Sequence, residues 1–459
     1  MRKTFLLLTV FMFAVLQGWQ VHADEPFPST YKALPANKVL VRGATILTGT
    51  GERLENTDIL LDNGKIVALG KQLSAEGAQV VAAEGRWVTP GLIDLHSHLG
   101  VYPSPGLTAH SDGNEMTSAS TPGVWAEHSI WPQDPGFSRA LAGGVTSLQI
   151  LPGSANLFGG RGVTLKNVYA NSYQAMKFPA APQALKMACG ENPKRVYGAN
   201  KQAPMTRMGN VSGYRHAWAK AQEYQKSLDD YQAALAKGGE KAEKAKPPKR
   251  DLKMETLSAV LRGEVRINMH CYRADEMLTI LDLAEEFGYK ITAFHHGVEA
   301  YKIADELAAA GVCAALWADW WGFKAEAYDG IQENIAIVDR PEGSCAIVHS
   351  DSSEGIQRLN QEAAKAMSRG NLVGMEISPE RAIRWITSNP AKALGIDDRT
   401  GSLEPGKMAD LVIWSQNPFS VYAHADQVYI DGALVFDRSN PALQPVSDFE
   451  LGQLLQENK

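Results

Sequence analysis

Two histidines separated by one residue, His96 and His98, are the side chains whose spacing points most directly to chemistry. They end a short apolar run that follows a Pro-Gly turn at 90–91. If the run is a strand, alternate side chains share a face, so both imidazoles project together from its C-terminal end. Two imidazoles side by side make half of a metal site. Alone, the motif is equally typical of two surface histidines in a loop.

Other residues of ligand type stand at the ends of later apolar runs. Runs typical of buried strands occur at 144–151, 184–187, 265–270, 291–294, 312–316 and 344–349. The polar side chains at or near their ends are Lys186, His270, His295, His296, His349 and Asp351. In a (β/α)8 barrel such groups converge on one mouth, because catalytic residues lie at the C-terminal ends of the strands. Histidine and carboxylate ligands together favour zinc or a similar divalent ion.

The elements that must position these residues alternate in type. Helical patterns at 274–287 and 300–310 lie between the strand-like runs. This alternation predicts an α/β fold with a parallel sheet, and the number of units favours a closed (β/α)8 barrel over a doubly wound sheet. The absence of a Gly-x-Gly-x-x-Gly motif after a strand gives no support to a nucleotide site.

Both ends of the chain have the pattern of short β-strands. Strand-like runs occur at 39–48 and 58–69, and again at 411–414 and 428–436, with hairpin turns at 62–64 and 431–432. The two ends could therefore form one small composite β-sandwich. The predicted organisation is a signal peptide at 1–23, sandwich strands at 24–88, a barrel at 89–390 with a helical excursion at about 215–260, and a second sandwich part with a tail at 391–459.

The N-terminus predicts export. Arg2 and Lys3 precede an apolar run, and small residues before Asp24 favour cleavage after Ala23. The run is short for a membrane span, so we expect a periplasmic or secreted protein with no membrane contact after signal removal. A net charge of −6 gives no sign of nucleic-acid binding. We expect a small-molecule substrate, and a homo-oligomer is left open. The four cysteines have no Cys-x-x-Cys spacing, and most are expected to be buried free thiols.

The segment 90–98 resembles the opening metal motif of the amidohydrolase superfamily, and the segment 401–412 resembles its late signature. Within it the chain is similar to the imidazolonepropionase-like and prolidase-like amidohydrolases, including exported bacterial members. The resemblance covers nearly all of the chain after the signal peptide, apart from the helical excursion. It implies a (β/α)8 metal-dependent hydrolase barrel with a composite β-sandwich, acting on a C–N bond.

The resemblance also implies roles for single residues. His96 and His98 match the first-strand metal ligands, and His270 matches the fifth-strand ligand. Asp351 matches the last-strand aspartate that binds metal and takes a proton from the nucleophilic water. Lys186 resembles the fourth-strand lysine that some subfamilies carbamylate to bridge two metal ions.

The sixth-strand ligand is ambiguous, because His295 and His296 are adjacent. Neighbours in a strand point to opposite faces, so only one is expected in the lumen. The segment after His296 looks like the one that follows the family's ligand, which favours His296. His349 is expected to orient the site from outside the ligand set.

Three residues are candidates for holding substrate. Tyr272 and Arg273 follow the fifth strand, and either could hold a substrate carboxylate. Arg161 stands in a Gly-rich, loop-like segment at 159–162 that could approach a ligand closely. The Trp-rich segment 317–321 could wall an apolar pocket.

Together these features predict a metal-dependent hydrolase that cleaves the amide bond of a dipeptide or N-acyl amino acid. The expected cofactor is Zn²⁺, as one or two ions, and a carbamylated Lys186 would favour two. The alternative is a mononuclear cyclic-amide hydrolase of the imidazolonepropionase type, or a deaminase. A non-catalytic binding protein with this fold is disfavoured, because every implied ligand position is filled.

Overall fold

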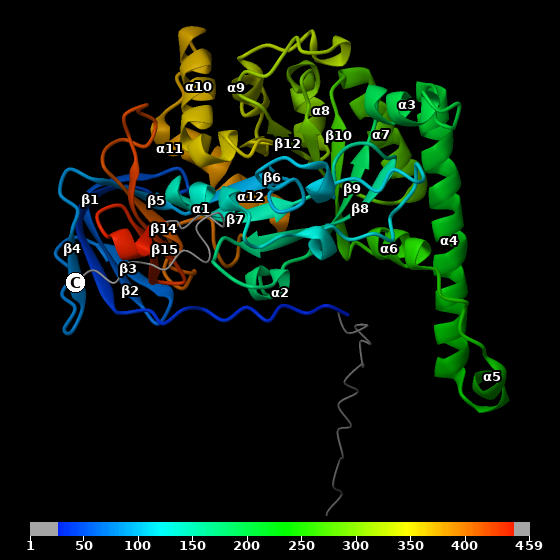
Figure 1. The fold of residues 1–459 in the computed structure, drawn as a ribbon, viewed down its shortest axis with the longest axis horizontal. Coiled ribbons are helices and arrows are strands. Elements are labelled where there is room, and N and C mark those ends of the chain that lie inside the picture. The colour runs from blue at the N-terminus through cyan, green and yellow to red at the C-terminus, as the bar shows by residue number, and fades with distance from the viewer. Residues whose placement is uncertain (1–25, 445–459) are drawn as a thin grey trace, which may run out of the picture.

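The computed structural model describes residues 26–444, and the signal peptide predicted at 1–23 lies outside this part of the chain. The described residues form two eight-stranded sheets. One sheet is built from both ends of the chain, and the other lies at the centre of the molecule with helices around it (Figure 1). The predicted barrel and its attached β-domain are therefore present.

The central sheet follows the order of the sequence. Its strands are β6 (Leu92–Ser97), β7 (Val145–Ile150), β8 (Phe158–Lys166), β9 (Gln183–Ala188), β10 (Val265–Cys271), β11 (Ile291–His296), β12 (Cys313–Leu316) and β13 (Ala346–Val348). The C-terminal ends of β6, β9, β10, β11 and β13 carry the predicted ligand residues. Asp351 N donates to His96 O at 3.1 Å, which ties the end of the last strand to the first.

One strand departs from the predicted parallel barrel. β8 runs antiparallel to both β7 and β9, because only a short loop separates it from β7 and a parallel return needs a longer crossover. The Gly-rich segment 159–162, expected to be a loop, therefore lies in a strand. Gly160 has a φ of +120°, and a Cβ there would lie 2.5 Å from Val124 O. Glycine at position 160 allows the close approach of the chain at Val124, and its role is in packing and not in ligand binding.

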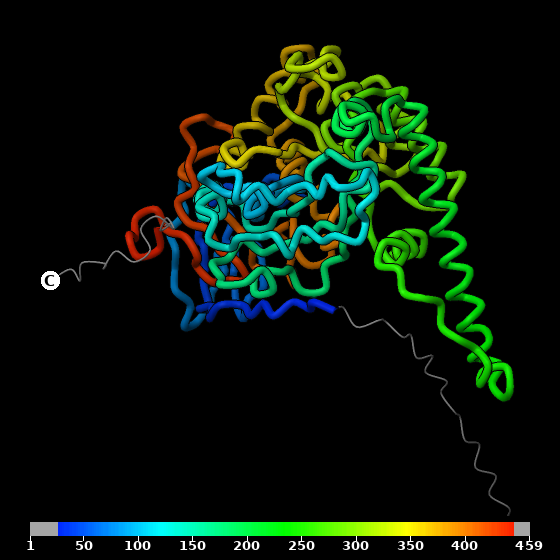
Figure 2. The backbone as a smooth tube through the Cα atoms, turned by 45° about the vertical axis from the view of Figure 1, so that its right-hand side comes forward, coloured from blue at the N-terminus to red at the C-terminus, as the bar shows by residue number. Residues whose placement is uncertain are grey.

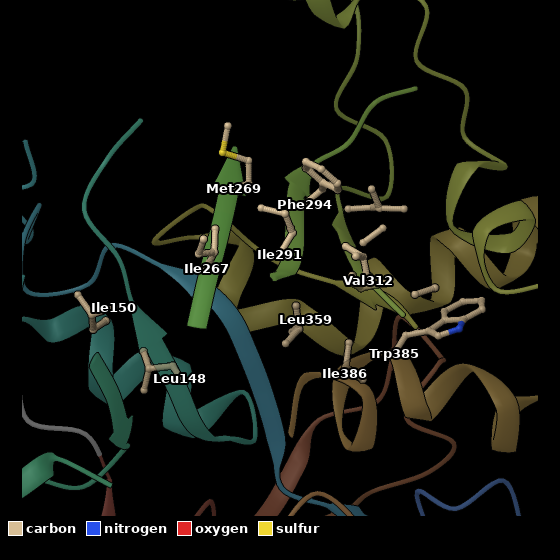
Figure 3. Packing of buried hydrophobic residues seen from close by; sticks show 14 of the residues in the cluster. Leu148, Ile150, Ile267, Met269, Ile291, Phe294, Val312, Leu359, Trp385 and Ile386 are labelled. Atoms are coloured by element: carbon tan, nitrogen blue, oxygen red, sulfur yellow. The ribbon is translucent and has the colours of Figure 1, made fainter. Parts of the chain in front are cut away.

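The outer face of the barrel packs against helices. Leu148 and Ile150 on β7, and Ile267 and Met269 on β10, belong to the main apolar core (Figure 3). The α-helices of the described residues are α1 (Pro135–Ala142), α2 (Tyr173–Met176), α3 (Glu191–Gly198), α4 (Arg207–Lys237), α5 (Gly239–Lys244), α6 (Leu252–Leu261), α7 (Ala274–Phe287), α8 (Ala304–Ala309), α9 (Asn334–Val338), α10 (Leu359–Leu372), α11 (Pro379–Ala382) and α12 (Ser388–Leu394).

Helix α7 illustrates why these segments are helical. Met277, Ile280 and Leu283 recur at helical spacing and are buried, which gives the helix one apolar face. Gly288 ends it in the left-handed conformation with φ +74°. Its bounds are those predicted from the sequence. The predicted helix at 300–310 is a 3-10 turn, Ala300–Ile303, followed by α8.

The second sheet joins the two ends of the chain. Its order is β16 (Ala433–Asp437), β15 (Ala425–Ile430), β14 (Leu411–Trp414), β5 (Trp87–Pro90), β1 (Val39–Leu47), β2 (Arg53–Asp62) and β3 (Lys65–Gly70), with β4 (Gln79–Ala82) also paired to β1. The antiparallel pair of β14 and β5 connects the C-terminal strands to the N-terminal ones. Both predicted hairpins are confirmed.

The helical excursion consists mainly of α4, which projects from the body and carries α5 at its tip (Figure 2). Tyr214, Trp218 and Ala221 on its first half are buried, whereas the far half is largely exposed. None of the helices between residues 26 and 444 is both long enough and apolar enough to cross a membrane.

The expectation of free thiols is wrong. Cys189 is bonded to Cys271, and Cys313 is bonded to Cys345. The two pairs join the ends of β9 and β10 and the starts of β12 and β13. The register explains the first pair, because Ala188 lies opposite His270 and brings the next residue of each strand together. The paired cysteines are 82 and 32 residues apart in the sequence, so no local pattern shows that they lie close together.

Candidate metal centre

Eight polar side chains meet inside the C-terminal mouth of the barrel, and we call them the mouth cluster. Its members are His96, His98, Lys186, His270, His295, His296, His349 and Asp351. All ligand residues predicted from the sequence belong to it. Apart from His98 and Asp351, which are half-buried, the members are buried.

His96 is the hub of the cluster. Its Nε2 lies 3.2 Å from His98 Nε2, 3.4 Å from Asp351 Oδ1 and 3.4 Å from Lys186 Nζ. Its Nδ1 lies 2.8 Å from His295 Nδ1. Strand β6 is responsible for this pairing, because His96 and His98 are two residues apart and share its inner face.

Asp351 faces the histidines from the last strand. Its Oδ1 lies 3.2 Å from His98 Nε2, and its Oδ2 lies 3.8 Å from His296 Nδ1. Its backbone has a φ of +48°, which is uncommon outside glycine and marks a position whose conformation its surroundings impose. The carboxylate therefore lies beside imidazole nitrogens from two other strands.

His295 and His296 both reach the cluster, which corrects the expectation that only one could do so. The rings of His295 and His296 lie 4.8 and 4.7 Å from the ring of His96, centre to centre. The strand rule fails here because His296 has a φ of +71°, so the chain turns at the residue where alternation would have carried its ring outward. The choice of His296 as the sixth-strand ligand stays a prediction.

Burial holds five of the six imidazoles neutral. Burial first, and then the charge of Lys186, hold the pKa of His96 well below its ordinary value. Burial likewise lowers the pKa values of His270, His295 and His296, and it lowers that of His349 to about 3. A neutral imidazole has a free lone pair and can bind a cation.

The carboxylate behaves in the opposite way. Burial alone would raise the pKa of Asp351, but the hydrogen bond from His98 and the nearby His349 and Lys186 bring it below its ordinary value. The cluster therefore presents an ionised carboxylate among buried imidazoles whose pKa values are lowered. This donor set has the composition of zinc sites.

Lys186 is the exceptional member of the cluster. Its side chain is fully buried, and its described polar contact is with His96 Nε2. Burial lowers the pKa of Lys186 to about 7, although the charge of Asp351 acts against the shift. The ammonium form is thus poorly stabilised where it stands.

The residues fit a divalent ion. Two groups have ligand atoms within 4.8 Å of one another: His96, His296 and His349, and His96, His98 and Asp351. Nδ1 of His270, Nδ1 of His296 and both ring nitrogens of His349 have no hydrogen-bond partner among residues 26–444. Unsatisfied buried nitrogens are costly, and metal coordination would satisfy them. His349, expected to orient the site from outside the ligand set, belongs to one of these two groups by distance, and its role stays a prediction.

Several supporting residues were not identified from the sequence. Asp94 is buried and accepts hydrogen bonds from Ser350 Oγ and His96 N, and burial raises its pKa to about 6. Asn268 Oδ1 lies 2.7 Å from His295 Nε2, and Leu151 O lies 2.8 Å from His98 Nδ1. Such partners fix ring orientation. Asp94 stands two residues before His96, and Asn268 stands two residues before His270. Because alternate side chains of a strand share a face, the sequence could have placed both beside the histidines.

Of the three substrate candidates, only Tyr272 lies at the cluster. Its ring centre is 4.6 Å from that of His270 and 5.8 Å from that of His296. Arg273 points outward, and its Nε donates to Asp275 Oδ1 at 3.0 Å. Arg161 packs on Trp125 at 4.4 Å and donates to Thr256 Oγ1. Arg161 is on the opposite face of its strand pair from Lys186, because Leu185 is its register partner.

A cationic side chain that was not among these candidates, Lys324, lies beside Tyr272. Lys324 Nζ lies 4.3 Å from the centre of the Tyr272 ring and donates to Asn192 Oδ1 at 3.0 Å. Asn192 Nδ2 in turn lies 3.3 Å from His270 Nε2. Lys324 stands in a long connection after β12, where the sequence offers no periodicity to place it.

Comparison with known proteins agrees with this geometry. A family model described as "Amidohydrolase family" matches residues 265–435, the region from β10 into β16 that includes His270, His296 and Asp351. A solved amidohydrolase structure from Thermotoga maritima MSB8 is 38% identical, with a TM-score of 0.79, and the match covers 87% of this chain and 100% of that one.

Two curated relatives differ in how much of their own length the match covers. Amidohydrolase tasK of Hapsidospora irregularis is 34% identical over 398 residues, which is 83% of this chain and 40% of tasK, so the chain spans less than half of that relative's length. An imidazolonepropionase of Mesorhizobium japonicum is 26% identical over 385 residues, which is 79% of this chain and 87% of that protein. With a barrel, a mouth cluster and a full-length structural relative in agreement, this chain belongs to the amidohydrolase family.

Proposed function

We propose that the protein is a metal-dependent hydrolase that cleaves a C–N bond, most simply an amide, in a small molecule. The observation that carries the proposal is the mouth cluster, in which neutral imidazoles and one ionised carboxylate converge at the end of a barrel of this family. Zn²⁺ held by His96, His98, His270, His296 and Asp351 would supply Lewis acidity toward a carbonyl oxygen and toward water.

Asp351 has the proton-transfer role in this proposal. Its carboxylate is ionised and half-buried beside His96 and His98. It can accept a proton from the attacking water and return it to the leaving nitrogen, as base and then acid. Asp94 holds the backbone at His96 and Ser350 and so fixes the first and last strands relative to each other.

Lys186 supports a site with two ions. With a pKa of about 7, a large share of its side chain is unprotonated amine at neutral pH. An unprotonated amine adds CO2 to form a carbamate and releases one proton, and the resulting anion suits a bridge between two cations. This favours a dipeptide or N-acyl amino acid as the substrate.

The second candidate is a mononuclear cyclic-amide hydrolase or deaminase. It is supported by the likeness to an imidazolonepropionase over 79% of the chain. An unmodified Lys186 with a single bound ion would favour it.

We further propose that the protein is exported and acts on small molecules outside the cytoplasm. The two disulfides support this, because such bonds persist in oxidising compartments and are rare in the cytosol. The predicted signal peptide supports it independently. Protein recovered from periplasm or medium should begin near Asp24 and show no free thiol on alkylation.

The test begins with metal content. Full-length mature protein should bind one or two zinc ions per chain, lose activity on chelation and regain it with Zn²⁺. A panel of dipeptides, N-acyl amino acids and cyclic amides then identifies the bond cleaved, with bicarbonate added to promote carbamate formation. Two ions and dipeptide cleavage would support the first candidate. No bound metal and no hydrolysis across the panel would refute the proposal.

A further inference from the structure

A group of aromatic side chains borders the mouth cluster, and we call it the aromatic wall. Its members are Tyr272, Trp317, Trp320, Trp321 and Phe323. Apart from Tyr272, which follows β10, they stand in the connection between β12 and α9. The proposed mechanism uses none of the three residues Trp320, Trp321 and Phe323.

The wall starts at a predicted metal ligand and runs outward. The ring of Trp317 stacks on His296 with centres 4.3 Å apart, and Trp320 stacks on Trp317 at 5.2 Å. Phe323 meets Trp317 edge-on at 5.7 Å. A small pocket lies beside these rings, and its lining includes His296, Trp317, Trp320 and Trp321.

The outer part of the wall is open to solvent. Trp320 is 42% exposed and Trp321 is 53% exposed, although both are large apolar residues. Exposed aromatic groups gathered beside a reaction site mark a surface that binds something apolar. The stacked geometry of Trp317 and Trp320 favours a flat group, because a further ring can extend the stack.

A second observation points to a polar atom on the same ligand. Trp317 is 7% exposed, and its Nε1–H has no hydrogen-bond partner within the described range of 26–444. A buried indole N–H normally finds an acceptor. A ligand oxygen that lies beside the Trp317 ring would supply it.

The charges that flank the wall are already paired. Lys324 contacts Asn192 Oδ1 and lies 3.4 Å from Glu191 Oε1. Asp319 accepts from Lys365 at 2.8 Å. With these charges paired, no free cation among the described contacts of the wall is offered to a substrate carboxylate, which suits an uncharged ring better.

We infer that the aromatic wall is a substrate subsite for an aromatic substituent next to the scissile amide, with Trp317 N–H donating to an oxygen of that substrate. This inference rests on the proposed function and narrows it to aryl or arylalkyl amides. The preference for such substrates would come from ring stacking and from the burial of apolar surface, and not from ion pairing.

The first test measures selectivity in the zinc-loaded full-length enzyme. The ratio of kcat/KM for N-benzoylglycine to kcat/KM for N-acetylglycine should exceed one. It should fall on the order of threefold to tenfold in Trp320→Ala and recover largely in Trp320→Phe. Tyr422→Ala, an exposed aromatic in the connection between β14 and β15, is the matched control and should leave the ratio unchanged. An unchanged ratio in Trp320→Ala overturns the inference.

A second test needs no turnover. Binding of N-benzoylglycine to the Asp351→Asn protein is measured by calorimetry, with and without Trp320→Ala and Trp317→Phe. Weaker binding in both variants supports the subsite, even if the panel of substrates shows no hydrolysis and the proposed function fails. If hydrolysis occurs but neither variant weakens binding, the subsite is wrong and the function stands. A lower molecular mass in solution for Trp320→Ala than for the wild type, without a change in binding, would assign the wall to a contact between copies, which also overturns the inference.

Discussion

Two fully buried lysines, Lys166 and Lys186, lie on neighbouring strands of the same barrel and have opposite surroundings. Lys166 ends β8 near the floor of the barrel, because β8 runs antiparallel to its neighbours. Lys186 lies on β9 at the mouth cluster. The same residue type in the same sheet therefore serves two different purposes.

The lysine at the floor is fully paired. Lys166 Nζ lies 2.8 Å from Asp431 Oδ1 and 3.4 Å from Asp410 Oδ1. Thr400 Oγ1 donates to Asp410 Oδ2 at 2.8 Å, and Tyr31 Oη donates to Asp431 Oδ2 at 2.5 Å. We call these five residues the floor cluster. It joins the N-terminal segment, the barrel and the second sheet.

The lysine at the mouth lacks such partners. Its described polar contact is one imidazole nitrogen, and burial lowers its pKa to about 7. Several imidazole nitrogens around it are also unsatisfied within residues 26–444. A satisfied buried network holds segments together, whereas an unsatisfied one is prepared to bind a group from outside. The contrast identifies the mouth as the functional end.

The largest expected effect is at the mouth. Asp351→Asn removes the carboxylate that would accept and return the proton, so kcat/KM should fall by about 10²- to 10⁴-fold. Steady-state kinetics on the best substrate of the panel measure it, and circular dichroism shows that the variant is folded. Retention of more than a tenth of wild-type kcat/KM would contradict the role of Asp351.

Lys166→Met tests the floor. It leaves Asp410 and Asp431 buried without their counter-charge, so the free energy of unfolding should fall by about 3–5 kcal/mol. Denaturant unfolding of the metal-free protein measures it. A change below about 1 kcal/mol would show that the floor cluster does not hold the fold.

Tyr31→Phe makes a smaller change in the same cluster. It removes the hydroxyl that donates to Asp431 while Lys166 remains, so the expected loss is about 1 kcal/mol. The same unfolding experiment applies. A loss as large as that of Lys166→Met would mean that the N-terminal segment, and not the ion pair, dominates the floor.

Lys186→Met should cause no loss of stability in the metal-free protein at neutral pH, because Lys186 forms no ion pair within residues 26–444 and the variant removes a buried amine whose pKa burial has lowered. Its effect should appear in metal content, which falls from two ions to one if the lysine is carbamylated. Elemental analysis after zinc loading measures it. A loss of several kcal/mol would erase the distinction between the two lysines.

The same variant gives a pH test. The pKa of Lys186 is about 7 in the folded protein and returns toward its ordinary 10.5 on unfolding. Between these values the unfolded chain binds more protons, so this group makes the free energy of unfolding rise with pH. The metal-free wild type should therefore gain stability relative to Lys186→Met from pH 7 to pH 10.5. Parallel curves for the two proteins would contradict the low pKa.

Much of the fold and of the site could be predicted from local sequence patterns. The strands that bear His96, Lys186, His270 and His296 were predicted, because buried strands appear as apolar runs and their polar ends stand out. Helix α7 was predicted with its correct bounds, because its periodicity and its C-terminal Gly288 are local signals. The hairpins at the chain ends were found through their turn residues.

What the sequence by itself determined is the set of elements and the residues at their ends, since periodicity and turn chemistry act over a few residues. Only the tertiary structure decided which remote groups meet: Cys189 with Cys271, Lys324 with Tyr272, and Lys166 with Asp410, which is 244 residues away. It also decided that β8 runs backward and that both His295 and His296 face His96. These features depend on the path of the chain between elements and on single backbone turns, such as the positive φ of His296.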